Sequence, residues 1–286
     1  MKSTYSVSSS IRELETDFAA IDRQGFDLID AKFNDGVWFS AYGKKIGKNS
    51  VSRDIVTAWR GEPTFRGFTQ RVEELEDKGY ELTDVEVTDD GYWLGIFASE
   101  QLESELITAR TRADFDRQVD ALQAQDANSV LGYQVVDIEY ADGLLIGVLD
   151  RNSSDADYSF SRNGTEFGRE VARQREAGLE LTNVEYVDGA WYGVFSDELT
   201  GLSIPSSRPH TSIRSFEAEI SDYQSRGYDL INIESIEGDW LGIYKENVDG
   251  TDDIITPSDR EAIADPVQNT LRTITQQTML DATFDP

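Results

Sequence analysis

The chain has 286 residues, of which 55 are acidic and 26 are basic, so its formal net charge is −29 and its pI is near 4.2. This charge argues against nucleic-acid binding through a broad electrostatic surface, because neutralising phosphates requires clustered Lys and Arg side chains. The absence of cysteine excludes a disulfide framework, a thiol nucleophile and a cysteine-ligated metal.

The N-terminal segment MKSTYSVSSSIRELETDF lacks the apolar core of a signal peptide, and no stretch reaches the roughly 18 apolar residues of a membrane span. We therefore expect a soluble protein without membrane insertion, either cytoplasmic or secreted by a non-classical route. The acidic residues are spread along the chain, which indicates a self-repelling surface suited to salt-rich surroundings. Dispersed calcium sites are the alternative, although no segment matches an EF-hand loop.

In chain order, residues 3–9 alternate in character and predict a short strand. Ser10 and Glu13 form a capping box that starts an amphipathic helix, and Gly25 ends this helix as a C-cap with positive φ. The segment GFDLIDAKFNDGVWFSAY from Gly25 predicts a β-hairpin, because an Asp-Gly pair separates two apolar runs. Its first apolar run slips by one residue, which predicts a bulge.

The same plan recurs, and the five hairpin segments follow one another at intervals of 46–54 residues, which is typical of a repeat architecture. Each hairpin has a small residue four positions after its turn glycine, which predicts close packing. The helices repeat one apolar face. The hairpin segments begin at Gly25, Gly79, Gly132, Gly178 and Gly227, and the helix faces begin at Leu14, Phe68, Phe115, Phe167 and Phe216.

We predict an α+β fold of five tandem strand-helix-strand-strand repeats, arranged as a pseudo-five-fold ring like an α/β propeller or as an open curved array. The repeats form a single domain over residues 1–249, and residues 250–286 form a capping tail with a C-terminal helix. A type I secretion signal is the alternative for this tail. The units span approximately residues 3–49, 50–102, 103–154, 155–200 and 201–249.

The run FTQRVEELEDKGYELTDVEVTDDGYWLGIF and its four counterparts resemble the tandem repeats beside the hydrolase domain of polyglycine hydrolases and related bacterial proteins. They are also similar to the C-terminal repeats of some plant protein kinases. The catalytic domain of the hydrolase family is a serine hydrolase of the β-lactamase type, and this sequence has neither SxxK nor GxSxG. The resemblance therefore implies the accessory repeat module, for which interaction is expected instead of catalysis.

Two series of residues are ligand-binding candidates. A tryptophan recurs in the second hairpin strand, where core packing is the first interpretation and a ring of faces for sugars or peptides is the second. An arginine recurs at the end of the extended segment that precedes each helix. There it either pairs with a neighbouring carboxylate or helps to bind a carboxylate or phosphate. The first series is Trp38, Trp93, Trp191 and Trp240, and the second is Arg60, Arg110, Arg162, Arg208 and Arg260.

The sequence indicates no catalytic set and no metal site. His210 is the one histidine and lies in SSRPHTS, a loop by composition, where we expect a solvated side chain. We expect a non-enzymatic scaffold that binds a protein, a glycan or a small anionic ligand. The alternatives are a hydrolase that uses acidic residues in a central cleft and a structural subunit of an extracellular or viral assembly.

Overall fold

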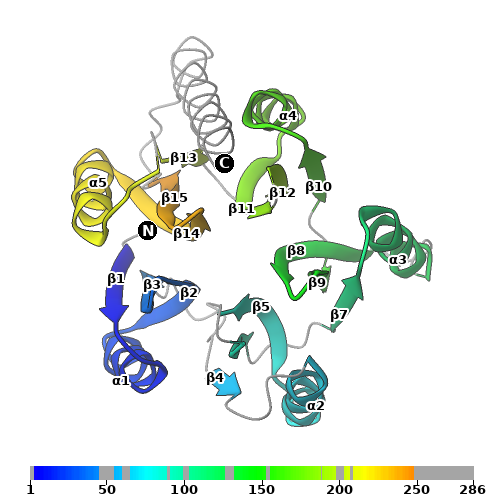
Figure 1. Cartoon of the computed structure of the whole chain (residues 1–286), viewed down its shortest axis with the longest axis horizontal. Coiled ribbons are helices and arrows are strands. Elements are labelled where there is room, and N and C mark those ends of the chain that lie inside the picture. Colours follow the sequence, from blue (N-terminus) through cyan, green and yellow to red (C-terminus); the bar gives the residue numbers. More distant parts are fainter. Residues whose placement is uncertain are drawn as a thin grey trace, which may run out of the picture. The chain divides into compact units, whose positions relative to one another are not determined.

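A computed structural model gives the α+β architecture of the chain (Figure 1). In its described part, five helices accompany five three-stranded antiparallel sheets. The described residues are 3–44, 55–59, 65–88, 91–98, 103–125, 132–152, 155–187, 189–197, 203–206 and 209–247.

The element order of strand, helix, strand, strand recurs five times, and we call each such set a copy. In every sheet the third strand of the copy lies between the other two. The first copy contains β1 (Ser3–Ser8), α1 (Ile11–Asp22), β2 (Phe26–Asn34) and β3 (Val37–Lys44); the second, β4 (Ile55–Trp59), α2 (Phe65–Glu76), β5 (Glu81–Val87) and β6 (Trp93–Ala98); the third, β7 (Ser104–Ala109), α3 (Arg112–Gln125), β8 (Gly132–Ala141) and β9 (Leu144–Asn152).

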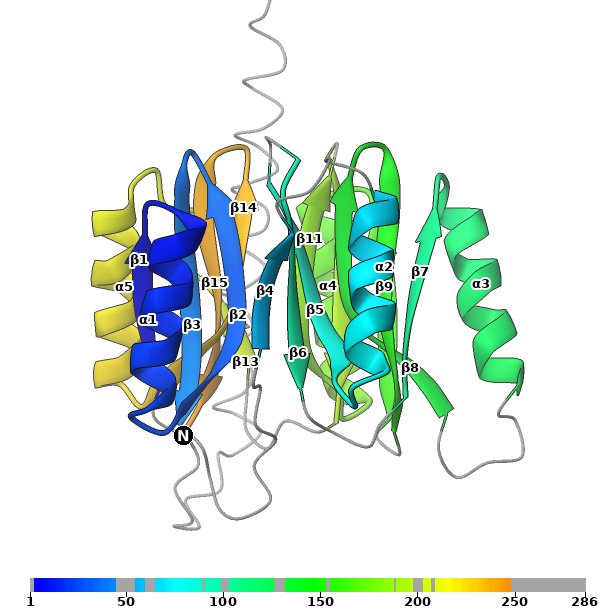
Figure 2. The same cartoon turned by 90° about the horizontal axis from the view of Figure 1, so that it is seen from below.

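The fourth and fifth copies follow the same plan. The fourth contains β10 (Ala156–Ser161), α4 (Gly164–Glu176), β11 (Glu180–Val187) and β12 (Ala190–Ser196); the fifth, β13 (Ser203–Pro205), α5 (Ile213–Ser225), β14 (Tyr228–Ile236) and β15 (Asp239–Glu246). The helices and the strands of their own sheets run alongside one another (Figure 2).

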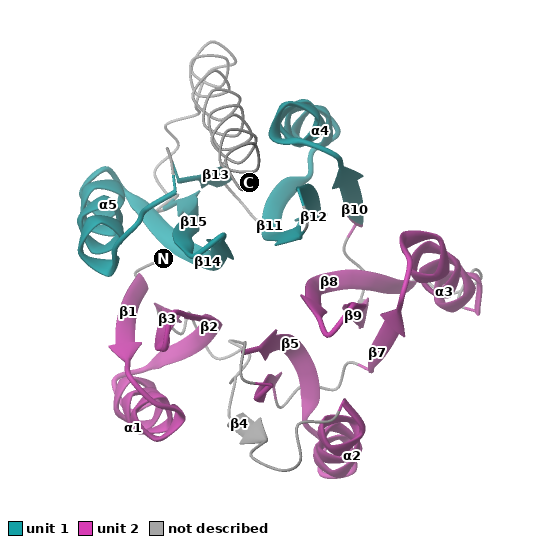
Figure 3. Ribbon diagram, viewed as in Figure 1, with its two compact units in different colours: residues 1, 157–286 teal, residues 2–156 magenta. Residues whose placement is uncertain are grey.

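The chain divides into two compact units (Figure 3). Unit 2 comprises residues 2–156 and contains the first three copies, while unit 1 comprises residues 157–286 together with Met1 and contains the last two. Within unit 2, β5 contacts both β2 and β8, and within unit 1, β11 contacts β14. The first hairpin strands of neighbouring copies therefore contact one another in both units.

The predicted bulge is present in all five hairpins. Each register shift lies at the same place of the first hairpin strand, as between Leu28 and Asp30, because this strand has one residue more there than the facing strand. The Asp-Gly turns are confirmed where both residues are described: Asp35 and Gly36 have φ angles of 48° and 79°, and Asp142 and Gly143 have 52° and 74°, as a two-residue hairpin of type I′ requires. Asp90 and Asp188 lie outside the described residues.

Helix signals in the sequence are confirmed in most copies. Ser10 caps α1 by accepting a hydrogen bond from Glu13 N at 3.2 Å. Four of the five helix-ending glycines have positive φ angles, but Gly132 is wrongly predicted: it belongs to β8, because its copy carries extra residues between the helix and the strand. The small residue in the second hairpin strand is packed closely, since a Cβ on Gly147 would lie 2.7 Å from Phe115 Cε2.

Apolar side chains join successive copies as well as helix and sheet. In the first copy, Leu14, Leu28 and Trp38 form a core with Leu94 and Ile96 from β6 of the second copy. Ile146 and Val148 of β9 join the core of the second copy in the same way. The second and third sheets of this unit therefore pack on their own helices with one face and on the preceding copy with the other.

Some predictions fall on residues that the structure does not describe. The C-terminal helix and the secretion signal lie in residues 250–286, outside the described residues. The predicted single domain over residues 1–249 and its unit boundaries remain predictions. Among the helices described above, none is long and apolar enough to cross a membrane.

Candidate functional site

Charged side chains are buried where β2, β5 and β8 meet in unit 2. Asp30 and Lys32 come from β2, Glu86 from β5, and Asp137 and Glu139 from β8, and each is at most 7% exposed. We call these five residues the acidic joint. Alternate side chains of a strand lie on the same face. The bulge changes which residues lie on this face, so that the residue at the bulge and the residue two positions later, such as Asp30 and Lys32, lie on the same side of the sheet.

Lys32 is the centre of the ion pairs in the acidic joint. Its Nζ lies 3.0 Å from Glu86 Oε2 and 2.9 Å from Glu139 Oε2. The carboxyl groups of Glu86 and Glu139 therefore share one ammonium group. The ammonium group of β2 is therefore ion-paired with both β5 and β8, which belong to the sheets of the second and third copies.

Two carboxylates of the acidic joint also bind the backbone of the preceding copy. Asp137 Oδ2 accepts a hydrogen bond from Val85 N at 3.1 Å, and Glu86 Oε1 accepts one from Phe33 N at 3.2 Å. Both contacts run from a first hairpin strand to the first hairpin strand of the copy before it. They satisfy backbone donors that would be costly to bury unpaired.

Burial and crowding of like charges raise pKa values in the acidic joint. Burial first, and then the charge of Glu139, raises the pKa of Asp137 to about 7. Burial and the Glu139 charge also raise the pKa of Glu86 well above its ordinary range, although Lys32 opposes them. Both shifts have the causes expected when several carboxylates share one low-dielectric site.

Unit 1 repeats this arrangement with fewer acids. Glu185 of β11 and Glu234 of β14 occupy the position of Glu86 and Glu139, and both are buried. At the bulge, however, the aspartate of the first three copies is replaced by Asn183 and Asn232. The two units thus place polar side chains at the same strand positions, but unit 1 has fewer ionisable groups there.

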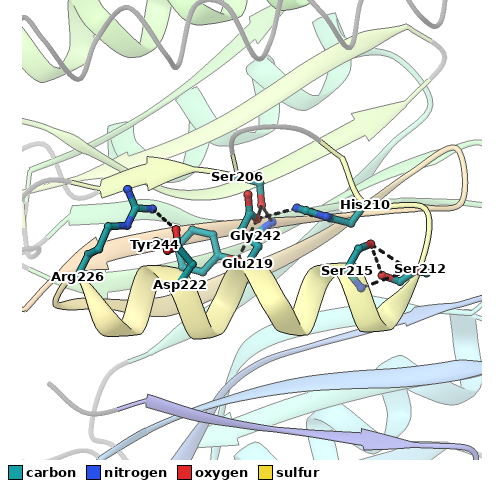
Figure 4. Close-up of polar contacts among 9 residues, drawn as sticks. All are labelled: Ser206, His210, Ser212, Ser215, Glu219, Asp222, Arg226, Gly242 and Tyr244. Carbon is teal, nitrogen blue, oxygen red and sulfur yellow. Dashed lines mark hydrogen bonds and ion pairs between the residues drawn. The ribbon is translucent and has the colours of Figure 1, made fainter.

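A second polar cluster lies inside the fifth copy (Figure 4). Three side chains approach Glu219 Oε2: Ser206 Oγ donates to it at 2.6 Å, Tyr244 OH donates at 3.2 Å, and His210 Nε2 lies 3.0 Å away. We call these four residues the Glu219 cluster. Burial, followed by the charge of Glu219, raises the pKa of Tyr244 above its ordinary value.

The Glu219 cluster contains the residue types of a serine hydrolase but not the required geometry. A nucleophilic serine gives its proton to a histidine, which a carboxylate orients. Here the Ser206 hydroxyl donates to Glu219 and accepts from Gly242 N at 2.8 Å, so it is engaged within the sheet. Ser206 is also fully buried. The arrangement fastens β13 to α5 and β15.

The first copy contains a related network. Ser6 Oγ and Tyr42 OH are 3.1 Å apart, and Ser8 Oγ donates to Asp17 Oδ2 at 2.9 Å. Tyr42 and Tyr244 occupy the same position of the copy, where the other three copies carry Phe97, Leu149 and Phe195. Because the set recurs, we interpret the serine, tyrosine and carboxylate as residues that join strand and helix within a copy.

The sequence prediction for His210 is wrong. His210 forms a bridge with Trp240, donating to and accepting from its backbone at 2.8 and 2.9 Å, and its side chain is buried. The composition of SSRPHTS suggested a solvated loop, but the segment continues the edge of the sheet beyond β13. Its buried partner Glu219 could have been found from the sequence, because it occupies the same helix position as Asp17 and Glu170.

The tryptophan series lies in the cores. Trp38, Trp93, Trp191 and Trp240 are 1–4% exposed. Their rings contact aromatic neighbours, as in the stacked pairs Phe68–Trp93 and Phe167–Trp191, whose centroids are 5.2 and 5.3 Å apart. This burial agrees with the packing interpretation, and the ligand-binding role remains a prediction.

Arg110 and Arg162 are exposed at the junctions between the outer strands and the helices α3 and α4. Arg162 contributes its backbone N–H to Glu166 Oε2 at 3.2 Å, and its guanidinium group lies on the surface. Arg60, Arg208 and Arg260 lie outside the described residues. Anion binding by this series remains a prediction.

Within the described ranges, no group of three or more His, Asp or Glu side chains is placed to hold a metal ion. The sequence matches no protein-family model and no curated protein. The resemblance to the repeat module of polyglycine hydrolases therefore remains a prediction.

Proposed function

We propose that the protein is a non-enzymatic repeat scaffold that presents the loops between its strands and helices to a partner protein, a glycan or a small anionic ligand. The observation that carries this proposal is that the side chains which could take part in catalysis make structural contacts instead. Ser206, His210 and Glu219 are buried and fasten one strand to one helix. The residues of the acidic joint fasten successive copies to one another.

The ligand chemistry is tested with inorganic phosphate as the probe. Exposed guanidinium groups at equivalent junctions are suited to oxyanions, because their fork of donors matches two oxygens at once. Phosphate is expected to raise the melting temperature of the wild-type protein and to leave that of a variant with Arg110→Ala and Arg162→Ala unchanged. An equal response of both proteins would remove these two arginines as ligands and leave a protein or glycan as the partner.

We propose further that the five copies close into a pseudo-five-fold ring. Support comes from a contact that occurs once in each unit. Glu81 Oε2 accepts hydrogen bonds from Ser104 N and Oγ at 3.1 and 3.0 Å, and Glu180 Oε2 accepts from Ser203 N and Oγ at 3.1 and 3.2 Å. Each joins the first hairpin strand of one copy to the outer strand of the next.

The ends of the array also carry a serine and a carboxylate at these positions, since Ser3 is aligned with Ser104 and Asp229 with Glu81. Because the chain lacks cysteine, a short bis-maleimide can test closure on a variant with Ser3→Cys and Asp229→Cys. A cross-linked monomer is expected for a ring. Cross-linked multimers that grow with protein concentration would instead indicate an open array that assembles, as a structural subunit does. A variant with Glu81→Cys and Ser104→Cys is the positive control.

A hydrolase is the second candidate, because a buried acid such as Asp137, whose pKa is raised to about 7, is typical of functional sites. A screen of glycoside, ester and phosphoester substrates is the direct test. The scaffold proposal predicts no turnover that is lost on substitution of Asp137→Asn or Glu219→Gln. Turnover that either substitution abolishes, in a folded variant, would establish the enzyme.

A further inference from the structure

Several carboxyl groups in unit 2 face one another across three copies. The groups that line this contact are Asp30 and Lys32 from β2, Asp84 and Glu86 from β5, and Asp137 and Glu139 from β8. On the other side of β5, β9 contributes the apolar side chains Ile146 and Val148. The carboxyl groups therefore outnumber the ammonium group that lies among them.

Full ionisation of this contact would place several negative charges in a site without bulk water. Burying a charge costs free energy unless the charge is paired, and a group in such a site takes up a proton instead. Glu86 and Glu139 show this crowding directly, because a carboxyl oxygen of each lies within 3.0 Å of the same ammonium nitrogen. Lys32 bridges the pair from the neighbouring copy.

From this geometry we propose that the acidic joint is a proton-controlled contact, which holds the first three copies of the repeat together when protonated and loosens when its carboxyl groups ionise. The opening of this contact is followed at two backbone amides, Val85 N and Phe33 N, which donate to Asp137 Oδ2 and Glu86 Oε1. This behaviour is independent of the ligand that the scaffold binds.

The direction of the pH effect follows from the raised pKa values. A carboxyl group whose pKa is higher in the folded than in the unfolded state binds its proton more tightly when folded, so protonation stabilises the fold. For Asp137 this stabilisation is lost as the pH rises from about 4, its unfolded value, to about 7. Other carboxylates act oppositely at low pH, because their hydrogen bonds lower the pKa of Glu13 and of Glu170. The useful window is therefore about pH 5–7.

Asp137→Asn is the decisive variant. The amide oxygen can still accept the hydrogen bond from Val85 N, and Asn already stands at the bulge of the fourth and fifth copies as Asn183 and Asn232. The replacement therefore suits the backbone and removes one titrating group. Glu86→Gln does the same for the pair on Lys32, and Asp120→Asn, on the exposed face of α3, is the matched control.

The measurement is urea unfolding of the full chain between pH 5 and 7. In the wild-type protein the unfolding constant is expected to rise by roughly tenfold per pH unit for each carboxyl group that holds a proton only when folded. Asp137→Asn is expected to lower this slope by about one proton, Glu86→Gln by a similar amount, and Asp120→Asn by none. Identical slopes for wild type and Asp137→Asn would overturn the proposal.

A second measurement needs no variant. Hydrogen exchange at the Val85 amide, corrected for the intrinsic rate, reports the opening of its bond to Asp137. Its protection is expected to fall at least tenfold between pH 5.5 and 7. The Trp240 amide, which donates to His210 O in unit 1, is the reference. Equal changes at the two amides would also contradict a change confined to the acidic joint.

Discussion

The first hairpin strands of unit 2 and those of unit 1 have the same backbone geometry but different numbers of ionisable side chains. Both have a bulge at the same position of the strand, and both bury a charged side chain two positions beyond it. At the bulge itself, unit 2 has the acids Asp30, Asp84 and Asp137, whereas unit 1 has Asn183 and Asn232. The fold therefore accepts a polar side chain there without requiring its charge, and the extra acids of unit 2 must be explained by something other than strand geometry.

The largest effect is expected from Lys32→Met, which removes the ammonium group of the acidic joint. Its ion pairs with Glu86 and Glu139 would be lost while both carboxyl groups remain buried. We expect a loss of about 3–5 kcal/mol in the free energy of unfolding at pH 7.5, and a smaller loss at pH 5. Urea unfolding measures it, with the exposed Lys78→Met as control. Equal losses in the two variants would show that the pairs contribute nothing.

A smaller effect is expected from Asn183→Asp, which gives unit 1 the acid that unit 2 already has. The Asn183 Oδ1 atom is buried, so a carboxylate at this place would be desolvated. We expect a loss of about 2 kcal/mol at pH 7.5 that disappears as the pH falls to 5. Unfolding of the variant and the wild type at both pH values measures the difference. A loss that is the same at both would mean that the new acid does not titrate.

The Glu219 cluster distinguishes unit 1 in another way. Glu219→Gln keeps an acceptor for Ser206 and Tyr244 but removes the charge beside His210. We expect a loss of about 1.5 kcal/mol, since hydrogen bonds to charged groups are stronger than neutral ones. Glu217→Gln on the same helix is the control in thermal and urea unfolding, and an equal result for both would remove the cluster as a stabilising feature.

The smallest effect is expected at the serine–glutamate contact that occurs once within each unit. Ser203→Ala and Ser104→Ala each remove one hydrogen bond to a glutamate of the preceding copy. We expect losses of about 1 kcal/mol in both cases, measured by urea unfolding against the exposed Ser221→Ala. Clearly unequal losses would show that the two contacts are not equivalent.

Much of the fold could be predicted from the sequence because its signals are local. The slip of the apolar pattern between Leu82 and Val85 indicated the bulge, and the Asp-Gly pairs indicated the hairpin turns. The prediction for Gly132 was wrong because residues inserted before it separate it from the helix, so that it begins a strand. Which copies share one compact unit is set by contacts distant in sequence, which a local pattern does not contain.

The acidic joint was not predicted, although a signal for it exists. A charged residue recurs two positions beyond each bulge, at Lys32, Glu86, Glu139, Glu185 and Glu234. A recurring charge within an otherwise apolar strand is unusual for a buried position. Without the neighbouring copy, however, these side chains look like the solvated face of a strand, and their burial depends on packing between copies.

The most direct test of the proton-controlled joint is the titration of the side-chain carboxyl carbons of the folded protein by carbon-13 NMR. The account predicts that the carboxyl carbon of Asp137 titrates with a pKa of about 7, because it is buried beside Glu139. The exposed Asp120 serves as an internal reference in the same spectra. If Asp137 instead titrates near 4, the ordinary value for an aspartate, it carries no proton at neutral pH and the account is contradicted.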